Sequence, residues 1–218
     1  MTKIISLLVL ASSLSISNRL VACTDALSLQ SKIEALLNAH NYAEIDELKL
    51  STGNKQQGDI ECIDSVVNVL MMKAYAHAKL GKNHLAKEEA LEASRILEPY
   101  ERTLYDGMKL RFAMAIILQQ IEFNLDPAGG GSFSEKLLED MSEFIESDDN
   151  NEPYPLLWQI KEMYVVASNL YAHKLINGND CHHALQVIKG SEHILPQDTI
   201  NEFKIGIERK KLKQMCDR

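Results

Sequence analysis

The sequence is poor in residues that interrupt helices and in residue types that favour strands. Its 218 residues include only five prolines and ten glycines, and runs of β-branched residues are few. Hydrophobic residues make up 45% of the chain, which is enough to form an ordered core. Leu, Ala, Glu and Lys are frequent, and these residues favour helix. We therefore predict an all-α protein.

Motifs of the common enzyme classes are missing as well. The chain contains no Gly-x-Ser-x-Gly, no His-Glu-x-x-His and no pair of carboxylates at a recognisable spacing. The glycine run AGGGS (128–132) lacks the lysine of a phosphate-binding loop and reads as a flexible connection. The acidic run ESDDNNE (146–152) lacks the spacing of a calcium loop. We predict no enzymatic activity and no cofactor.

The strongest candidate for a metal site is His182-His183, which directly follows Cys181. Neighbouring residues on a helix point about 100° apart, so both rings cannot face one ion without help. His193 lies three turns further along, and the other histidines are scattered. We therefore predict no metal site. An enzyme that uses His173 or the His182-His183 pair is the last alternative.

Positive charge and long apolar runs are also scarce. The chain has 23 basic and 31 acidic residues, a net charge of −8. An acidic surface repels phosphate backbones, so we predict no nucleic-acid partner. Beyond the N-terminus, the longest apolar run is FAMAIIL (112–118), which is too short to cross a bilayer. We predict no integral membrane segment.

The first residues have the composition of a secretion signal. The apolar run from Ile4 to Leu14 has the length of a signal-peptide core and leaves no polar face. We expect residues 1–22 to be a signal peptide and the protein to be periplasmic or secreted. Cys23 follows Leu-Val-Ala, the order that bacterial lipoprotein signals favour, so a lipid anchor at Cys23 is the alternative.

From residue 26 onward, apolar residues recur with a helical period. Polar, glycine-bearing or proline-bearing stretches separate the periodic segments. The predicted helical segments are a pair within 27–50, then 63–80, 85–97, 103–125, 134–145, 156–176, 181–195 and 200–216.

Two of these helix pairs share a pattern of turn, small residues and proline. Small side chains at these positions let the second helix of a pair pack closely on the first. The matched residues are Gly81, Ala86, Ala93 and Pro99 in one pair, and Asn179, Ala184, Ser191 and Pro196 in the other.

This pattern resembles the tetratricopeptide repeat, whose period is about 34 residues. The resemblance implies a short solenoid of antiparallel helix pairs with a C-terminal capping helix. It also implies that residues 23–218 form a single repeat domain. A non-repetitive helical bundle is the alternative.

The four cysteines can be paired on this arrangement. An exported protein is expected to oxidise its cysteines in pairs. In such an array, Cys23 and Cys62 lie at the same end of parallel helices. Counting outward from the turn at 196–197, Cys181 falls within a helical turn of Cys216. We predict the disulfides Cys23–Cys62 and Cys181–Cys216; a lipid on Cys23 would leave Cys62 unpaired.

Arrays of this family bind extended or helical peptides on a concave face lined by the first helix of each pair. The same register in this chain predicts a groove that is polar, donor-rich and partly aromatic. Its residues are Asn68, Met71, Tyr75, Lys79, Asn169, His173 and Asn177. The family's carboxylate-clamp members carry Lys and Asn where this chain has Met71 and Tyr75, so the pattern does not favour capture of a C-terminal carboxylate.

The sequence thus predicts an exported, non-enzymatic binding or scaffold module of the cell envelope. It would engage another protein or a peptide through the helix-lined groove. The alternative is a dedicated inhibitor of the immunity type that blocks one folded toxin or enzyme, with its acidic surface steering it to a basic partner.

Overall fold

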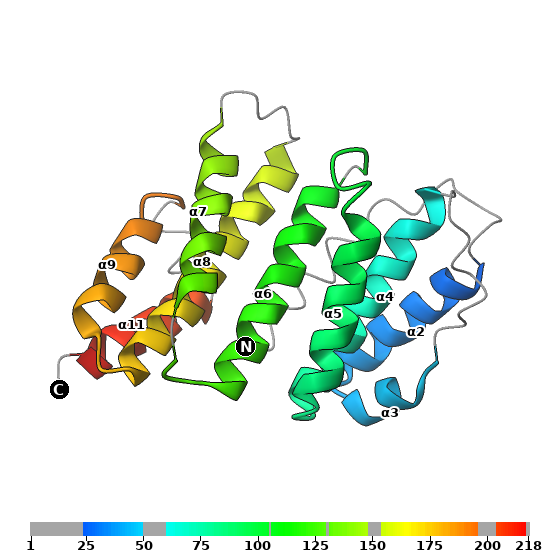
Figure 1. Ribbon diagram of the computed structural model, residues 1–218, viewed down its shortest axis with the longest axis horizontal. Helices are drawn as coiled ribbons and strands as arrows, with labels where there is room; N and C mark the ends of the chain where they lie inside the picture. The colour runs from blue at the N-terminus through cyan, green and yellow to red at the C-terminus, as the bar shows by residue number, and fades with distance from the viewer. Residues whose placement is uncertain are drawn as a thin grey trace. The chain divides into compact units, whose positions relative to one another are not determined.

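The computed structural model describes residues 24–49, 60–104, 106–129, 131–147, 154–195 and 204–216, and within them every regular element is an α-helix (Figure 1). The predicted all-α fold class is therefore confirmed. The chain divides into two compact units, with the boundary between Ile121 and Glu122.

Each unit is built around one long helix. In the first unit α4 packs against α2, α3 and α5, and in the second α8 packs against α7, α9 and α11. Helix α9 ends about one turn before the predicted Leu195, and α6 runs across the boundary between the units. The helices are α2 (Thr24–Asn38), α3 (Tyr42–Glu47), α4 (Ile60–Lys79), α5 (Asn83–Leu97), α6 (Gly107–Leu125), α7 (Ser132–Glu146), α8 (Tyr154–Asn177), α9 (Cys181–Ser191) and α11 (Lys204–Cys216).

Three helix-to-helix turns have the same backbone conformation. His40, Gly81 and Asn179 have positive φ angles of 57°, 74° and 64°. Each is followed by a residue whose N–H donates to a carbonyl five residues earlier, the hydrogen bond of a Schellman helix end. Gly81 and Asn179, which the sequence pattern matched, are thus structurally equivalent. The three bonds are Asn41 to Leu36 (2.9 Å), Lys82 to His77 (2.8 Å) and Asp180 to Leu175 (2.8 Å).

The second helix of each matched pair packs through small side chains. Ala86 and Ala93 of α5 are fully buried, and so are Ala184 and Ser191 of α9. Small residues at a helix contact let the two axes approach closely. The close packing predicted at these four positions is confirmed.

The glycine run before α7 has a packing role that the sequence did not indicate. Gly131 directly precedes α7, and a Cβ atom there would overlap the ring of the buried Tyr171 on α8. The Tyr171 hydroxyl donates to Glu135 in the first turn of α7. The connection therefore fixes the start of α7 against α8.

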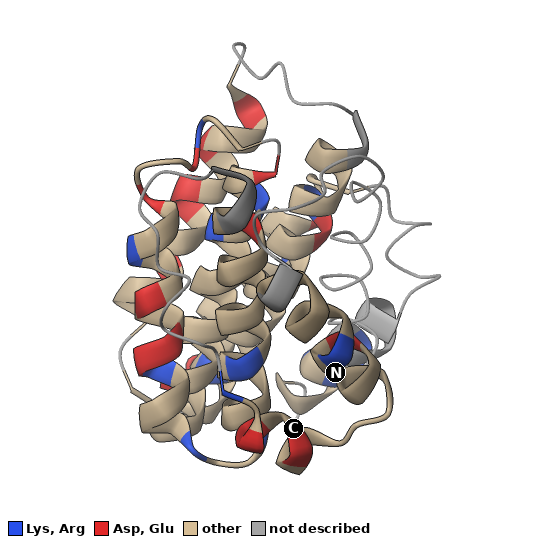
Figure 2. Cartoon of the chain, turned by 90° about the vertical axis from the view of Figure 1, so that its right-hand side faces the viewer, with Lys and Arg blue, Asp and Glu red and all other residues tan. Residues whose placement is uncertain are grey.

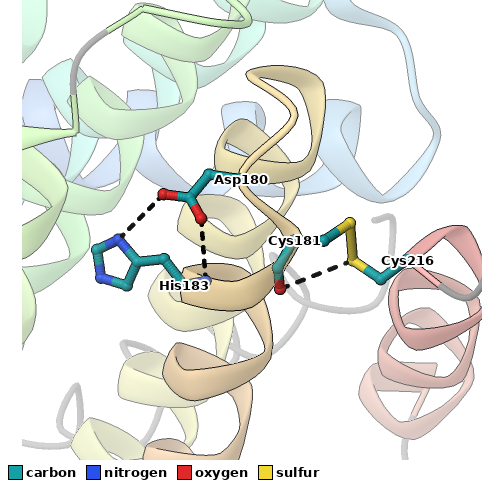
Figure 3. Close-up of a disulfide and its surroundings, with 4 residues drawn as sticks. All are labelled: Asp180, Cys181, His183 and Cys216. Carbon is teal, nitrogen blue, oxygen red and sulfur yellow. Dashed lines mark hydrogen bonds and ion pairs between the residues drawn. A yellow bond between two sulfur atoms is a disulfide. The ribbon is translucent and has the colours of Figure 1, made fainter.

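A disulfide joins the start of α9 to the end of α11 (Figure 3). The Cα atoms of Cys181 and Cys216 are 5.4 Å apart, and the predicted pairing of these two cysteines is confirmed. Beside the bond, Leu212 of α11 is buried in an apolar cluster with Ala172, Ile176, Ala184 and Ile188. The disulfide and the burial of Leu212 both attach α11 to the second unit.

Several predictions for the N-terminal part fall outside the described residues. They are the signal peptide 1–22, the lipid anchor at Cys23 and the Cys23–Cys62 bridge. Of the helices that the structure describes, none combines the length and the apolar character needed to cross a membrane.

Replacing Cys181 and Cys216 together by Ser should lower the free energy of unfolding by about 2–4 kcal/mol, because the bond closes a long loop. Urea denaturation of the oxidised proteins measures the difference. Reductant should move the wild type toward the double variant. Equal stability of the oxidised wild type and the variant would show that α11 does not depend on the bond.

Candidate functional site

The seven residues predicted to line a groove differ in exposure. Lys79 and Asn177 are exposed, and His173 is partly buried. The other four are buried in the chain, so the groove stays a prediction, and the structure instead shows what each side chain contacts. The four buried residues are Asn68, Met71, Tyr75 and Asn169.

On α4, the polar side chains are engaged within the first unit. The amide of Asn68 donates to a carboxylate oxygen of Asp64, at 2.9 Å. The ammonium of Lys79 lies 5.1 Å from the centroid of the Tyr75 ring, and the Tyr42 ring meets Tyr75 edge-on. Burial, and then Tyr42, raise the pKa of Tyr75. These contacts give the α4 residues partners inside the unit, although Asn68 Oδ1 is buried without one among the described residues.

On α8, four polar or aromatic residues form a stripe with a different character. Trp158, Glu162, Asn169 and His173 lie within an arc of about 60° on the helix, and we call them the α8 stripe. The Trp158 indole N–H donates to Glu162 Oε1 at 3.1 Å. Glu162 is only 7% exposed, yet its Oε2 has no hydrogen-bond partner among the described residues.

The surroundings of Glu162 destabilise its charged form. Burial raises the pKa of the Glu162 carboxyl group, and the hydrogen bond from Trp158 offsets part of this effect. A buried carboxylate is stable when a cation or several donors face it. Glu162 has one donor on one oxygen, so it carries unused capacity for a further donor.

His173 is a second residue of the α8 stripe whose side chain has a polar atom without a hydrogen-bond partner among the described residues. Its ring meets the ring of Phe123 edge-on, with the centroids 5.2 Å apart. Its Nδ1 atom is buried and has no hydrogen-bond partner among the described residues. A buried polar atom without a partner costs about 1–3 kcal/mol, and in a native protein such atoms are rare. Glu162 Oε2 and His173 Nδ1 of the α8 stripe are both atoms of this kind.

Because the two turns are equivalent, the hydrogen bonding of Glu162 can be compared with that of the acid at the aligned position in the first unit. Aligning Gly81 with Asn179 places Asp64 opposite Glu162 and Asn68 opposite Val166. In the first unit the amide of Asn68 donates to the acid. Val166 has no side-chain donor, so the acid of the second unit lacks this contribution.

The sequence analysis missed a charged cluster in the first unit. The buried His77 of α4 places Nδ1 2.6 Å from Glu89 of α5 and Nε2 2.8 Å from Asp46 of α3. Lys73 pairs with Glu89 at 3.4 Å, and Lys82 with Asp46 at 2.6 Å. The hydrogen bonds from Lys82 and then His77 lower the pKa of Asp46. The alternating charges satisfy one another, so we assign the cluster to joining α3, α4 and α5.

No local sequence signal announced this cluster, because its members lie far apart in the chain and meet only in the fold. Acidic and basic residues are interspersed along the helices drawn in Figure 2.

The Cys181-His182-His183 segment shows two histidines with separate surroundings. His182 Nε2 faces the side-chain amide of Gln186 at 3.0 Å. Asp180 caps α9 by accepting from the backbone N–H of His183 at 3.1 Å, and its other oxygen lies 3.8 Å from the His183 ring (Figure 3). Within the described residues, no group of three His, Cys, Asp or Glu side chains is arranged to hold a metal ion.

Comparison of the chain with protein-family models, with curated proteins and with solved structures finds no match.

Replacing His77 by Leu should destabilise the first unit by about 2–4 kcal/mol, because two partly buried carboxylates lose the imidazole that bridges them. The matched control is His84→Leu, since His84 is 88% exposed and lies beside Glu88 on the same helix face. The control should change the stability by less than about 0.5 kcal/mol. Urea denaturation followed by circular dichroism measures both, and equal effects would contradict the role assigned to His77.

Proposed function

We propose that this chain is an exported, non-enzymatic binding module that engages a peptide or protein partner through the α8 stripe. The observation that carries the proposal is the pair of buried polar atoms on the stripe, Glu162 Oε2 and His173 Nδ1, which lack partners among the described residues. Folding alone disfavours such atoms. A ligand that forms hydrogen bonds with these two atoms would therefore gain a favourable contribution to its free energy of binding.

The dimensions of the stripe suit an extended peptide. From Trp158 to His173 the helix rises by about 22 Å, the length of about seven extended residues. The equal turns and the small-residue packing support the tetratricopeptide-like scaffold that the sequence predicts. In this family such helices bind peptides, which is consistent with the proposed role.

Export to the cell envelope is part of the proposal. Disulfides persist in oxidising compartments, so the Cys181–Cys216 bond supports a periplasmic or secreted location. The apolar N-terminal run supports the same location. A lipid anchor at Cys23 remains the alternative form of attachment, and the net charge of −8 supports a protein or peptide partner over a nucleic acid.

The test uses the immobilised full-length protein and a random nonapeptide library. We expect the wild type to enrich a subset of peptides, and His173→Ala to bind that subset about fivefold more weakly, the effect of one hydrogen bond. The matched control is His193→Ala, which removes an exposed histidine from the same unit. The melting temperature of both variants shows whether the fold is retained.

Two outcomes would count against the proposal. Enrichment that is equal for the wild type, His173→Ala and His193→Ala would exclude the α8 stripe as the binding surface. If no peptide is enriched but the protein binds one folded envelope protein or toxin tightly, the result would favour the alternative function, a dedicated inhibitor of the immunity type.

A further inference from the structure

We infer that the α8 stripe recognises a basic side chain, and that the Lys or Arg of a partner peptide is held between the Glu162 carboxylate and the Trp158 indole. The inference rests on the proposed function and names the chemistry of its ligand. Four observations carry it: the open carboxylate oxygen, the neighbouring indole, the contrast with the first unit, and the charge of the chain.

Glu162 Oε2, which has no partner among the described residues, can accept a hydrogen bond, and a cationic donor is preferred. Oε1 already accepts the indole N–H, whereas Oε2 is buried without a partner among the described residues. A neutral donor would satisfy one lone pair but leave the buried negative charge without compensation. An ammonium or guanidinium group supplies the donors and the charge together.

Trp158 adds a second preference for a cation. Its indole is hydrogen-bonded to Glu162 and is only partly buried, whereas Glu162 is buried. The face of an indole ring attracts Lys and Arg. A carboxylate and an indole side by side thus offer two contacts that both require positive charge.

In the first unit, the acid at the aligned position accepts a hydrogen bond from an amide of its own helix. There, Asp64 receives the amide of Asn68. In the second unit, Val166 stands in place of that amide, and Glu162 is longer by one methylene. The two aligned acids therefore differ in the residue four positions later, and in the second unit the unpartnered carboxylate oxygen belongs to Glu162 on α8.

The charge of the chain and the length of the stripe define the ligand further. A net charge of −8 attracts basic segments and repels acidic ones. Asn169 and His173 lie about 10 and 16 Å along the helix from Glu162, within reach of the backbone of an extended peptide. We expect a ligand of about seven residues with Lys or Arg near one end.

The test is a selection from the random nonapeptide library by the wild type, by Glu162→Gln and by Glu139→Gln. Glu139 is an exposed residue of α7 in the same unit, so its substitution is a matched loss of charge. Enriched peptides are sequenced, resynthesised with Lys or with norleucine, and titrated while Trp158 fluorescence is recorded. Trp158 is the one tryptophan of the chain, so its emission reports binding at this site.

We expect the wild type and Glu139→Gln to enrich Lys and Arg, and norleucine or Glu162→Gln each to weaken binding about tenfold or more. If the wild type enriches peptides without Lys or Arg, or Glu162→Gln keeps the same preference, the inference is wrong while the proposed function stands. If no peptide is enriched, peptide binding through the α8 stripe is excluded, and the inference fails with it.

A stability measurement separates recognition from a structural role of Glu162. A carboxyl group whose pKa is raised by folding binds more protons in the folded state, so its contribution to stability falls as the pH rises through the folded pKa. Glu162→Gln should therefore be at least as stable as the wild type at neutral pH. Its free energy of unfolding should not show the decrease that the Glu162 carboxyl group causes in the wild type as the pH rises above about 4. A variant that loses both binding and stability at neutral pH would overturn the inference.

Discussion

The close approach of a short helix to a long one is the constraint on which both units depend. Ala86 and Ala93 on α5, and Ala184 and Ser191 on α9, are fully buried against their partner helices. A larger side chain at any of them would push the helices apart and disturb the left-handed turn that joins them. Once this contact is made, the long helix presents a fixed set of residues on its remaining faces, and those residues determine what each unit can do.

The two units stabilise the same helix pair by different chemistry. The first places His77 and Glu89 across the pair, with Asp46 completing the charged cluster. At the two equivalent positions the second unit has Leu175 and Val187, and it adds the disulfide to α11. Apolar packing around Ala184 and Ile188 and the edge-on contact of the His183 ring with Tyr171 of α8 hold α9. No member of the α8 stripe takes part in these contacts, which supports a role in binding.

The sequence was sufficient for the fold class and for features encoded by short-range pattern. Apolar periodicity located the helices, and Gly81 and Asn179 identified equivalent turns because few residues tolerate a positive φ angle. Burial of polar side chains could not be predicted in this way. Asn68 and Glu162 are polar residues on helices, and their burial becomes visible only when the helices pack. The structure then shows that the Asn68 amide donates to Asp64, whereas Glu162 Oε2 has no partner among the described residues.

The protonation of Glu162 in the presence of ligand shows whether a bound cation faces its carboxylate. The carboxyl carbon of Glu162 can be followed by nuclear magnetic resonance as the pH is varied, with and without a saturating enriched peptide. In the unliganded protein, burial should raise the pKa above the ordinary glutamate value of about 4.3. A bound Lys or Arg should lower the pKa of Glu162 markedly, because the cation favours the carboxylate. An unchanged pKa in the complex would contradict the account.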